Sequence, residues 1–194
     1  MPQNIIKISE AELLKAACCN LSESFETNPS VDVNHSDAIT GTKQIEMLGL
    51  KSPYILITEE NIPMVRGASQ TFGLGFTPGT WIESIQVTKG MGSVTNGYES
   101  IVGQINTEIK KPFTDMPFFL NLFNSVDGRF EANAHIRSKV SEKMNNTLFI
   151  HYNDRKKSND KNGDEFLDKP VQEQLNLLSK WQYTDTSKGL VSFL

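Results

Sequence analysis

Residues 81–112 constrain the fold of this chain more than any other segment. Ile82, Ile85 and Val87 begin a β-favourable run, which glycines interrupt before a second apolar run ends at Pro112. The interrupting glycines and the later apolar residues are Gly90, Gly92, Gly97, Ile101, Val102, Ile105 and Ile109. The pattern predicts a strand, a flexible connection and a second strand.

The first 30 residues are predicted to be helical, with a break near Asn20. Ser9 with Glu12 fits a capping box, and Asn20 with Glu23 repeats it. The apolar face of the first helix would consist of Leu13, Leu14, Ala17 and Leu21. Pro29 ends the second helix near Thr27.

Short strands and glycine-rich loops follow these helices. The predicted strands are residues 31–33, 44–48 and 54–57, with a turn at 61–63 and a loop over 66–80. Residues 1–112 are therefore expected to form one small mixed α/β unit.

Residues 113–194 change to a period-two pattern. Apolar and polar residues alternate over 130–137, which places one row of side chains on each face of a strand. Residues 148–153 repeat the alternation with Phe149 as the exception, and residues 120–122 and 175–177 are shorter versions. The expected connections are a hairpin turn at 126–129, a short connection over 139–146, a long polar loop over 156–170 and another connection over 184–189.

The segment 82–106 resembles the end of the plug domain of TonB-dependent outer-membrane receptors. Residues 82–90 match the family's IExIxVxKG strand, Gly97-Tyr98 its YG-like step and residues 102–106 its GGxINI-like strand. Residues 48–50 and 55–64 are similar to the "RGL" and "ILIDGVP" steps. The resemblance covers about residues 9–112, and residues 18–23 are similar to receptors of the Bacteroidetes type.

This resemblance implies an α+β plug domain (1–112) followed by the first antiparallel strands of a transmembrane β-barrel (113–194) in the outer membrane. The plug would gate the energy-coupled uptake of a scarce solute, such as a metal chelate or corrinoid. Its partners would be a TonB-type periplasmic protein, the solute and outer-membrane lipid. Barrels of this kind have roughly 22 strands of about 10 residues each. Residues 117–194 are too few for that number, so we expect a fragment or a truncated reading frame.

In the barrel interpretation, the two rows of residues 130–137 face different surroundings. The row expected to face lipid is Phe130, Ala132, Ala134 and Ile136. The row expected to face the wet lumen is Glu131, Asn133, His135 and Arg137.

Charge and motif content argue against several other functions. The net charge is −4 and acidic residues surround the only run of three basic residues, 155–157, so nucleic-acid binding is not expected. Residues 90–97 lack the Gly-Lys-Ser/Thr ending of a phosphate loop. In the calcium-like stretch that begins at residue 158, Ser158 and Lys169 occupy ligand positions that carboxylates should fill. No nucleophile and base pair stands out, so an enzyme is not expected.

Candidate binding residues lie in the loop 64–78. Met64, Arg66, Gln70, Phe72 and Phe76 would offer an apolar and cationic surface to a solute. The alternative for each residue is packing against the barrel wall.

Cys18 and Cys19 are adjacent, so a bond between them would be strained. They are either buried small residues at a helix end or a soft-metal or redox site. No resident cofactor is expected. The alternative to a transporter is a non-transport module, soluble or surface-attached, that binds a peptide or glycan through the same loops, since a soluble sheet with one wet face also alternates.

Overall fold

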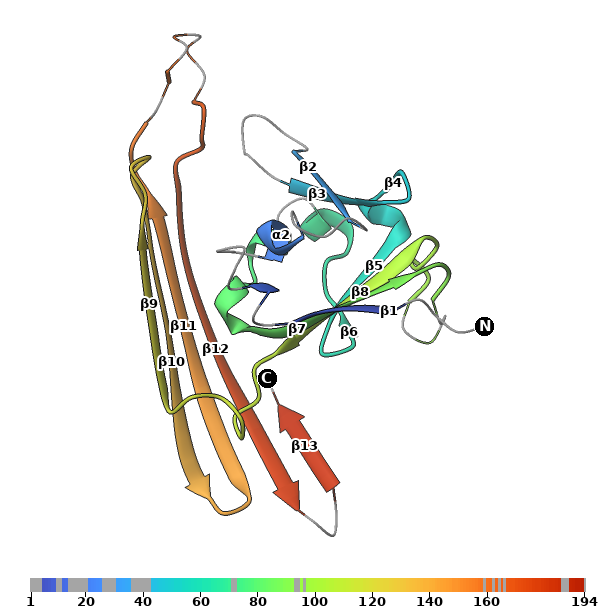
Figure 1. The fold of residues 1–194 in the computed structure, drawn as a ribbon, viewed down its shortest axis with the longest axis vertical. Coiled ribbons are helices and arrows are strands. Elements are labelled where there is room, and N and C mark those ends of the chain that lie inside the picture. The colour runs from blue at the N-terminus through green and yellow to red at the C-terminus, as the bar shows by residue number, and fades with distance from the viewer. Residues whose placement is uncertain are drawn as a thin grey trace. The chain divides into compact units, whose positions relative to one another are not determined.

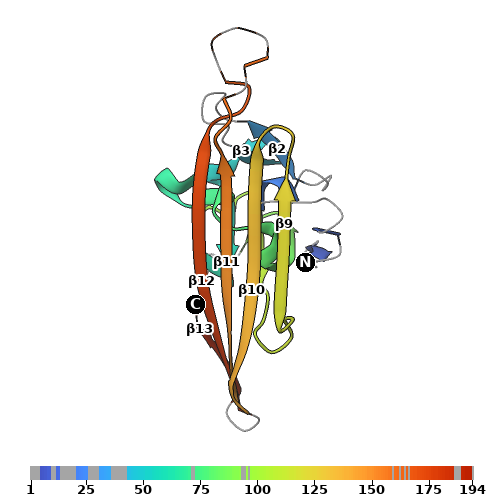
Figure 2. The ribbon, with the colours of Figure 1, turned by 90° about the vertical axis from the view of Figure 1, so that its left-hand side faces the viewer.

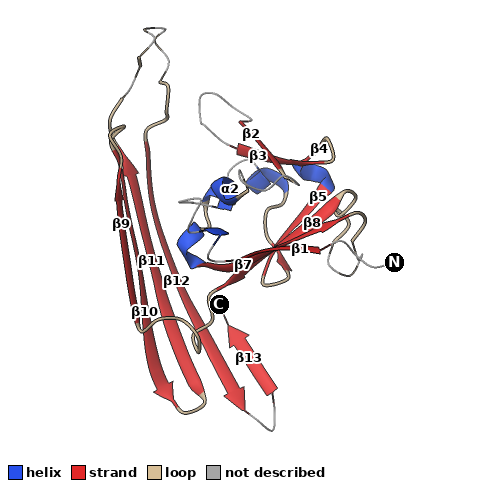
Figure 3. Ribbon diagram, viewed as in Figure 1, coloured by secondary structure: helices blue, strands red, loops and turns tan. Residues whose placement is uncertain are grey.

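The chain folds into two compact units, Met1–Ile109 and Lys110–Leu194. The computed structural model describes residues 5–9, 12–13, 21–25, 31–35, 43–70, 73–92, 95, 97–158, 160–161, 163, 165, 167–185 and 189–193. All described α- and 3-10 helices lie in the first unit, and the second consists of strands and their connections (Figure 3). The predicted order, a mixed α+β unit followed by antiparallel strands, is confirmed.

The first unit contains two sheets and short helices. Its helices are α2 (Leu21–Ser24), η1 (Ser52–Tyr54), η2 (Gly67–Gln70), η3 (Gly73–Gly75) and η4 (Gly79–Trp81). Its strands are β1 (Ile5–Ser9), β2 (Asp32–His35), β3 (Lys43–Met47), β4 (Leu50–Lys51), β5 (Ile55–Glu59), β6 (Ile62–Pro63), β7 (Ile82–Lys89) and β8 (Gly103–Ile109). Among the described helices, none is long and apolar enough to cross a membrane.

The larger sheet has the order β1-β7-β8-β5-β6, and the smaller has the order β2-β3-β4. β7 and β8 are the two strands predicted from residues 81–112, and they pair antiparallel. β5 pairs with β8 in parallel, from Ile55 opposite Gly103 to Glu59 opposite Thr107. A strand inside a sheet that is covered on both faces is apolar throughout, which explains the uninterrupted Ile-Leu-Ile run of β5.

The helical prediction for the first 30 residues is wrong at β1. Ile5–Ser9 forms an edge strand that pairs antiparallel with β7, because tertiary pairing overrides the weak local preference of so short a segment. The predicted capping contact does form, since the Glu12 carboxylate accepts hydrogen bonds from the Ser9 amide at 2.8 Å and its hydroxyl at 2.9 Å.

The turn predicted at 61–63 lies one residue earlier. Glu60 and Asn61 have positive φ angles of 52° and 63°, as a type I′ hairpin requires, and Ile62–Pro63 forms β6. Asn106 on β8 supports this turn, because its side-chain oxygen accepts hydrogen bonds from the Asn61 amide at 2.9 Å and the Thr58 hydroxyl at 2.8 Å.

One apolar core joins the two sheets of the first unit. In Figure 1, α2 lies between the β2–β3 hairpin and the larger sheet. Leu21 and Phe25 bury their side chains in a cluster with residues of β3, β5, β7 and β8, including Ile45, Met47, Ile57, Ile85, Val87 and Ile105. Burying side chains of this size contributes about 1.5–3 kcal/mol each.

The second unit is one antiparallel sheet with the order β13-β12-β11-β10-β9. Its strands are β9 (Phe118–Asn124), β10 (Arg129–Ser141), β11 (Met144–Arg155), β12 (Gln172–Asp185) and β13 (Gly189–Phe193). Figure 2 shows β9 to β12 side by side. The hairpin at 126–129 and the connection over 156–170 are confirmed.

The connection predicted over residues 139–146 is wrong in length. β10 and β11 remain paired to Ser141 opposite Met144, so that the turn consists of Glu142 and Lys143. The polar residues of this stretch, such as Lys139 opposite Asn145, belong to the strand ends and not to a loop.

The two faces of the second unit differ as the alternation predicts. Glu131, Asn133 and His135 are buried, whereas Phe130 and Ile136 are exposed. The face that carries Phe130 and Ile136 has exposed large apolar residues on all four strands from β9 to β12. They include Phe118, Leu120, Leu122, Leu148, Leu175, Leu177 and Trp181. Phe149, the exception in the sequence pattern, lies in the buried row.

Gly103 provides a test of how the two sheets of the first unit fit together. A Cβ at this position would lie 2.6 Å from the Met47 methyl group and 2.8 Å from the Thr88 carbonyl oxygen. We expect Gly103→Ala to lower the free energy of unfolding by about 1–3 kcal/mol, because it overpacks a filled space. Chemical denaturation followed by the fluorescence of buried Trp81 measures this change.

Gly75→Ala is the matched control, since nothing lies within 4 Å of a Cβ at that position. Equal effects of the two substitutions would contradict the close contact at Gly103.

Candidate functional site

The candidate binding residues of loop 64–78 differ in their surroundings. Met64 follows β6, is exposed and donates its backbone N–H to the Ile57 carbonyl at 3.0 Å. Gln70 ends η2, and Phe76 is exposed. Phe72 lies outside the described residues.

Arg66 is held by a two-point ion pair with Glu99. Its Nε lies 2.7 Å from Glu99 Oε1, and its Nη2 lies 2.9 Å from Oε2. The Glu99 side chain is only 7% exposed, whereas that of Arg66 is 43% exposed. Such a planar, charge-assisted contact fixes orientation as well as distance, so it ties the loop after β6 to the segment before β8.

The neighbours of Glu99 complete this contact. A Cβ on Gly97 would lie 2.5 Å from Arg66 Nη2, so the guanidinium approaches the backbone where no side chain stands. The exposed Tyr98 ring lies 5.8 Å from the guanidinium carbon of Arg66. We name Arg66, Gly97, Tyr98 and Glu99 the loop clamp.

The described candidates do not form one cluster. Arg66 lies toward the amino end of β5, where a Cβ on Gly97 would contact both its guanidinium and Leu56. Phe76 precedes Thr77, whose hydroxyl donates to the Glu59 carboxylate at the other end of β5 at 3.0 Å. The loop therefore runs the length of β5, and Phe76 is separated from Arg66.

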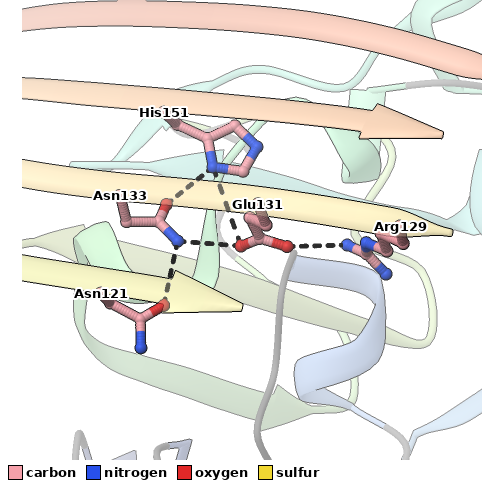
Figure 4. A network of polar contacts seen from close by, with 5 residues as sticks. All are labelled: Asn121, Arg129, Glu131, Asn133 and His151. Carbon is pink, nitrogen blue, oxygen red and sulfur yellow. Dashed lines mark hydrogen bonds and ion pairs between the residues drawn. The ribbon is translucent and has the colours of Figure 1, made fainter. Parts of the chain in front are cut away.

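A polar network lies on the buried face of the second unit (Figure 4). The Glu131 carboxylate accepts hydrogen bonds from Arg129 Nη2 at 3.0 Å and from Asn133 Nδ2 at 2.9 Å. Asn133 Nδ2 also lies 3.4 Å from Asn121 Oδ1, and Asn133 Oδ1 lies 2.7 Å from His151 Nδ1. Three strands, β9, β10 and β11, thus share one network.

The network defines the hydrogen position on His151. Because the Asn133 amide nitrogen donates to Glu131, its oxygen faces the imidazole and accepts a hydrogen bond. Nδ1 of His151 is therefore the protonated nitrogen. The arrangement orients polar side chains and contains no nucleophile.

An apolar layer crosses the same face next to this network. Phe119, His135, Phe149 and Leu178 occupy directly opposed positions on four neighbouring strands. The His135 ring lies between Phe119 at 4.6 Å and Phe149 at 4.8 Å, measured between ring centroids. On the far side of this layer, Arg137 and Lys180 flank Thr147 in the next row.

The connection between β11 and β12 is organised by carboxylates. Asp160 accepts backbone hydrogen bonds from Gly163 at 2.7 Å and Glu165 at 3.0 Å, which makes it a turn acceptor and not a free metal ligand. Asp127 at the β9–β10 turn forms a hydrogen-bonded ion pair with Lys169, and this contact lowers the pKa of its carboxyl.

Cys18 and Cys19 lie outside the described residues, so their metal or redox role stays a prediction. Within the described part of the chain, no group of three or more His, Cys, Asp or Glu side chains could hold a metal ion.

Several residues of these sites carry no local signal in the sequence. Arg66 is a candidate from its place in a loop, but its partner Glu99 lies 33 positions away. Period two predicts which face Glu131 and Asn133 occupy, whereas their link to His151 depends on the register between β10 and β11.

Comparison with known families identifies the first part of the chain. The family model described as the TonB-dependent receptor plug domain matches residues 1–104. No curated protein matches the chain.

Solved structures share the fold at low identity. The match to the ferric-catecholate import receptor Fiu from E. coli K12 has a TM-score of 0.71 and 16% identity and covers 94% of this chain and 25% of Fiu. The match to the pyoverdine receptor FpvA from Pseudomonas aeruginosa has a TM-score of 0.75 and 13% identity, and it covers 99% of this chain and 27% of FpvA. The match to the siderophore receptor PiuA from Acinetobacter baumannii has a TM-score of 0.72 and 15% identity, and it covers 96% of this chain and 25% of PiuA. The chain thus spans about a quarter of the length of these structures.

The loop clamp is expected to stabilise the first unit. Arg66→Met leaves the buried Glu99 carboxylate without its cation, so we expect a loss of about 1–3 kcal/mol in the free energy of unfolding. Lys139→Met, which removes the cation of an exposed pair with Glu142, should cost less than about 1 kcal/mol. Chemical denaturation measures both, and equal losses would show that the clamp adds no stability.

The Asp127–Lys169 pair makes a pH-dependent contribution to stability. The hydrogen bond and the charge of Lys169 lower the pKa of Asp127 below 3.8, with smaller help from Lys161 and Arg155. The contribution is therefore fully present above the unfolded value and is lost as the pH falls through the lower folded pKa. We expect Lys169→Gln to raise the pKa of Asp127 in a carboxyl NMR titration.

Lys139→Gln is the control for this titration. It should raise the pKa of Glu142, which a hydrogen bond and the charge of Lys139 lower, and leave Asp127 unchanged. A shift of Asp127 in Lys139→Gln, or none in Lys169→Gln, would contradict the assignment.

Proposed function

The chain belongs to the TonB-dependent receptor plug family, and from this premise we propose that it forms the gate and leading wall strands of an outer-membrane importer. In this proposal residues Met1–Ile109 are the gate and residues Lys110–Leu194 begin the wall. Outer-membrane lipid, a transported solute and a TonB-type periplasmic protein are its partners.

The observation that carries the proposal is the continuous apolar row on one face of β9 to β12. Leu120, Leu122 and Leu177 are each more than half exposed there, while the opposite face carries the Glu131–Asn133–His151 network. Monomeric proteins in water rarely expose a contiguous apolar surface of this extent. A wall with lipid against its apolar face and the polar interior of a barrel against the other accounts for both faces.

The same row argues against the alternative of a soluble module that binds a peptide or glycan. A soluble sheet with one wet face would direct its apolar row into a core and its polar row to water. Here the apolar row is the exposed one, and the polar row is buried.

The gate would work by a shift between two arrangements. Solute bound on the outer side and a pull from the periplasmic side must each favour the open arrangement, since a ligand shifts an equilibrium only through its differential affinity for the two states. This function requires no covalent step, so we propose no catalytic residues.

For the solute we propose a metal chelate of the siderophore class. The similar structures are described as a ferric-catecholate importer, a pyoverdine receptor and a siderophore receptor. The candidate contacts remain Met64, Arg66, Gln70, Phe72 and Phe76. An anionic chelate with aromatic groups suits a cation and apolar side chains.

The proposal is tested by binding and uptake with the complete protein. Ferric enterobactin, ferric pyoverdine and cobalamin are offered to cells with and without the TonB-type protein. We expect saturable binding of a ferric chelate, and uptake that requires the TonB-type protein. Binding of none of the probes, or uptake independent of that protein, would contradict the proposal.

Loop variants test the candidate contacts in the same assay. Phe76→Ala should weaken chelate binding several-fold if its exposed ring contacts the solute. Met91→Ala, which truncates an exposed apolar residue outside the loop, is the matched control.

A further inference from the structure

Residues 110–117, which we name the linker, join β8 to β9 and have a defined fold. The amides of Thr114 and Asp115 both donate to the Lys111 carbonyl, at 3.0 and 2.9 Å. Asp115 Oδ1 accepts a hydrogen bond from the Met116 amide at 2.9 Å. The segment is thus a compact turn and not an extended connection.

The backbone of Phe113 is bound by side chains from two strands. Its amide donates to Gln182 Oε1 of β12 at 3.3 Å, and its carbonyl accepts from Arg137 Nη1 of β10 at 3.3 Å. The Arg137 amide also donates to the Pro117 carbonyl at 3.0 Å. Because β10 and β12 are separated by β11, these contacts span three strands of the sheet.

A buried pair of ionisable side chains lies where the linker meets the sheet. Asp115 Oδ2 lies 3.6 Å from His135 Nδ1, and the two side chains are only 3% and 0% exposed. Among the described residues, neither ring nitrogen of His135 nor Asp115 Oδ2 has a hydrogen-bond partner. Lys110 adds a further contact, with its ammonium group 5.1 Å from the centroid of the Phe119 ring.

These contacts lie on the face that carries the polar network. His135 and Phe119 belong to the apolar layer, and Arg137 and Gln182 lie beyond it toward the β10–β11 turn. The linker therefore docks on the polar and buried face of the sheet, where it does not compete with the exposed apolar row.

We propose that the linker is a fixed anchor that holds the carboxyl end of the gate to the wall, with Gln182 and Arg137 as its positioning residues. This inference rests on the proposed gate function. β8 ends at Ile109 and the anchored segment begins at Lys110, so the anchor fixes the chain directly after the last strand of the gate. Rearrangements that open the gate then occur upstream of β8.

The first measurement is hydrogen exchange of the linker amides in the complete protein, without solute. Gln182→Met keeps the size of the side chain but removes the acceptor, and should speed exchange of the Phe113 amide roughly tenfold. Gln182→Glu retains an acceptor oxygen and should restore slow exchange. The control is Gln172→Ala. Gln172 lies on the same strand and the same face as Gln182, and among the described contacts it has none with the linker.

Exchange of Phe113 in the wild type at the rate of an exposed amide would overturn the docking. So would equal rates in the wild type and Gln182→Met. Neither outcome depends on solute binding, so a failure here is distinct from a failure of the proposed importer function.

The second measurement tests whether the docked linker holds the gate. Cells that carry the complete protein with Gln182→Met and Arg137→Ala are compared with wild-type and Gln172→Ala cells for sensitivity to vancomycin, a large probe. We expect the double variant to be severalfold more sensitive to vancomycin than the wild type, and Gln172→Ala cells to be as sensitive as the wild type. Faster exchange without greater sensitivity would show a docked linker that does not anchor the gate, and would overturn the inference.

Discussion

The registered pairing of β10 with its two neighbours is the constraint on which the second unit depends. Side chains alternate between faces, so a slip of one residue would move every apolar side chain of a strand to the polar face. The observed register places Ile136 opposite Phe118 on one side and Leu148 on the other. The same register brings Asn133 opposite His151, which forms the network on the other face. An exposed apolar surface, a buried polar network and the docking face of the linker all follow from one alignment.

The first unit reaches its stability differently, through contacts between segments far apart in sequence. The parallel pairing of β5 and β8 has no short connection, so a long excursion must return the chain to the same sheet. That excursion contains the loop after β6, β7 and the glycine-rich segment. The loop clamp joins the first and last of these parts, and Asn106 secures the β5–β6 turn from the neighbouring strand. These polar contacts thus add to the apolar core, which the loop after β6 reaches through Val65 and Leu74.

Sequence patterns predicted the parts of this fold that local physics determines. β7, β8 and the two faces of β10 follow from β-favourable residues and period two, and the Ser9–Glu12 contact follows from capping. β1 was missed because a five-residue edge strand is defined by its partner β7 and not by its own residues. The β10–β11 turn was predicted too long because the polar residues at the paired ends of these strands resemble a loop. For the site, Arg66 was a candidate from loop composition, whereas Glu99 and the contact of Phe113 with Gln182 depend on the folded register.

The contact between Gly103 and Met47 has a mechanical consequence. The methyl end of Met47 on β3 lies over the backbone of β8, in a space that any side chain at position 103 would fill. The Met47 side chain therefore fills the space beside Gly103, and the two sheets of the first unit are in close contact at this point. A force applied to the β2–β3 hairpin would reach the larger sheet through the shared core, and at this contact Met47 would have to move before the smaller sheet could slide along β8.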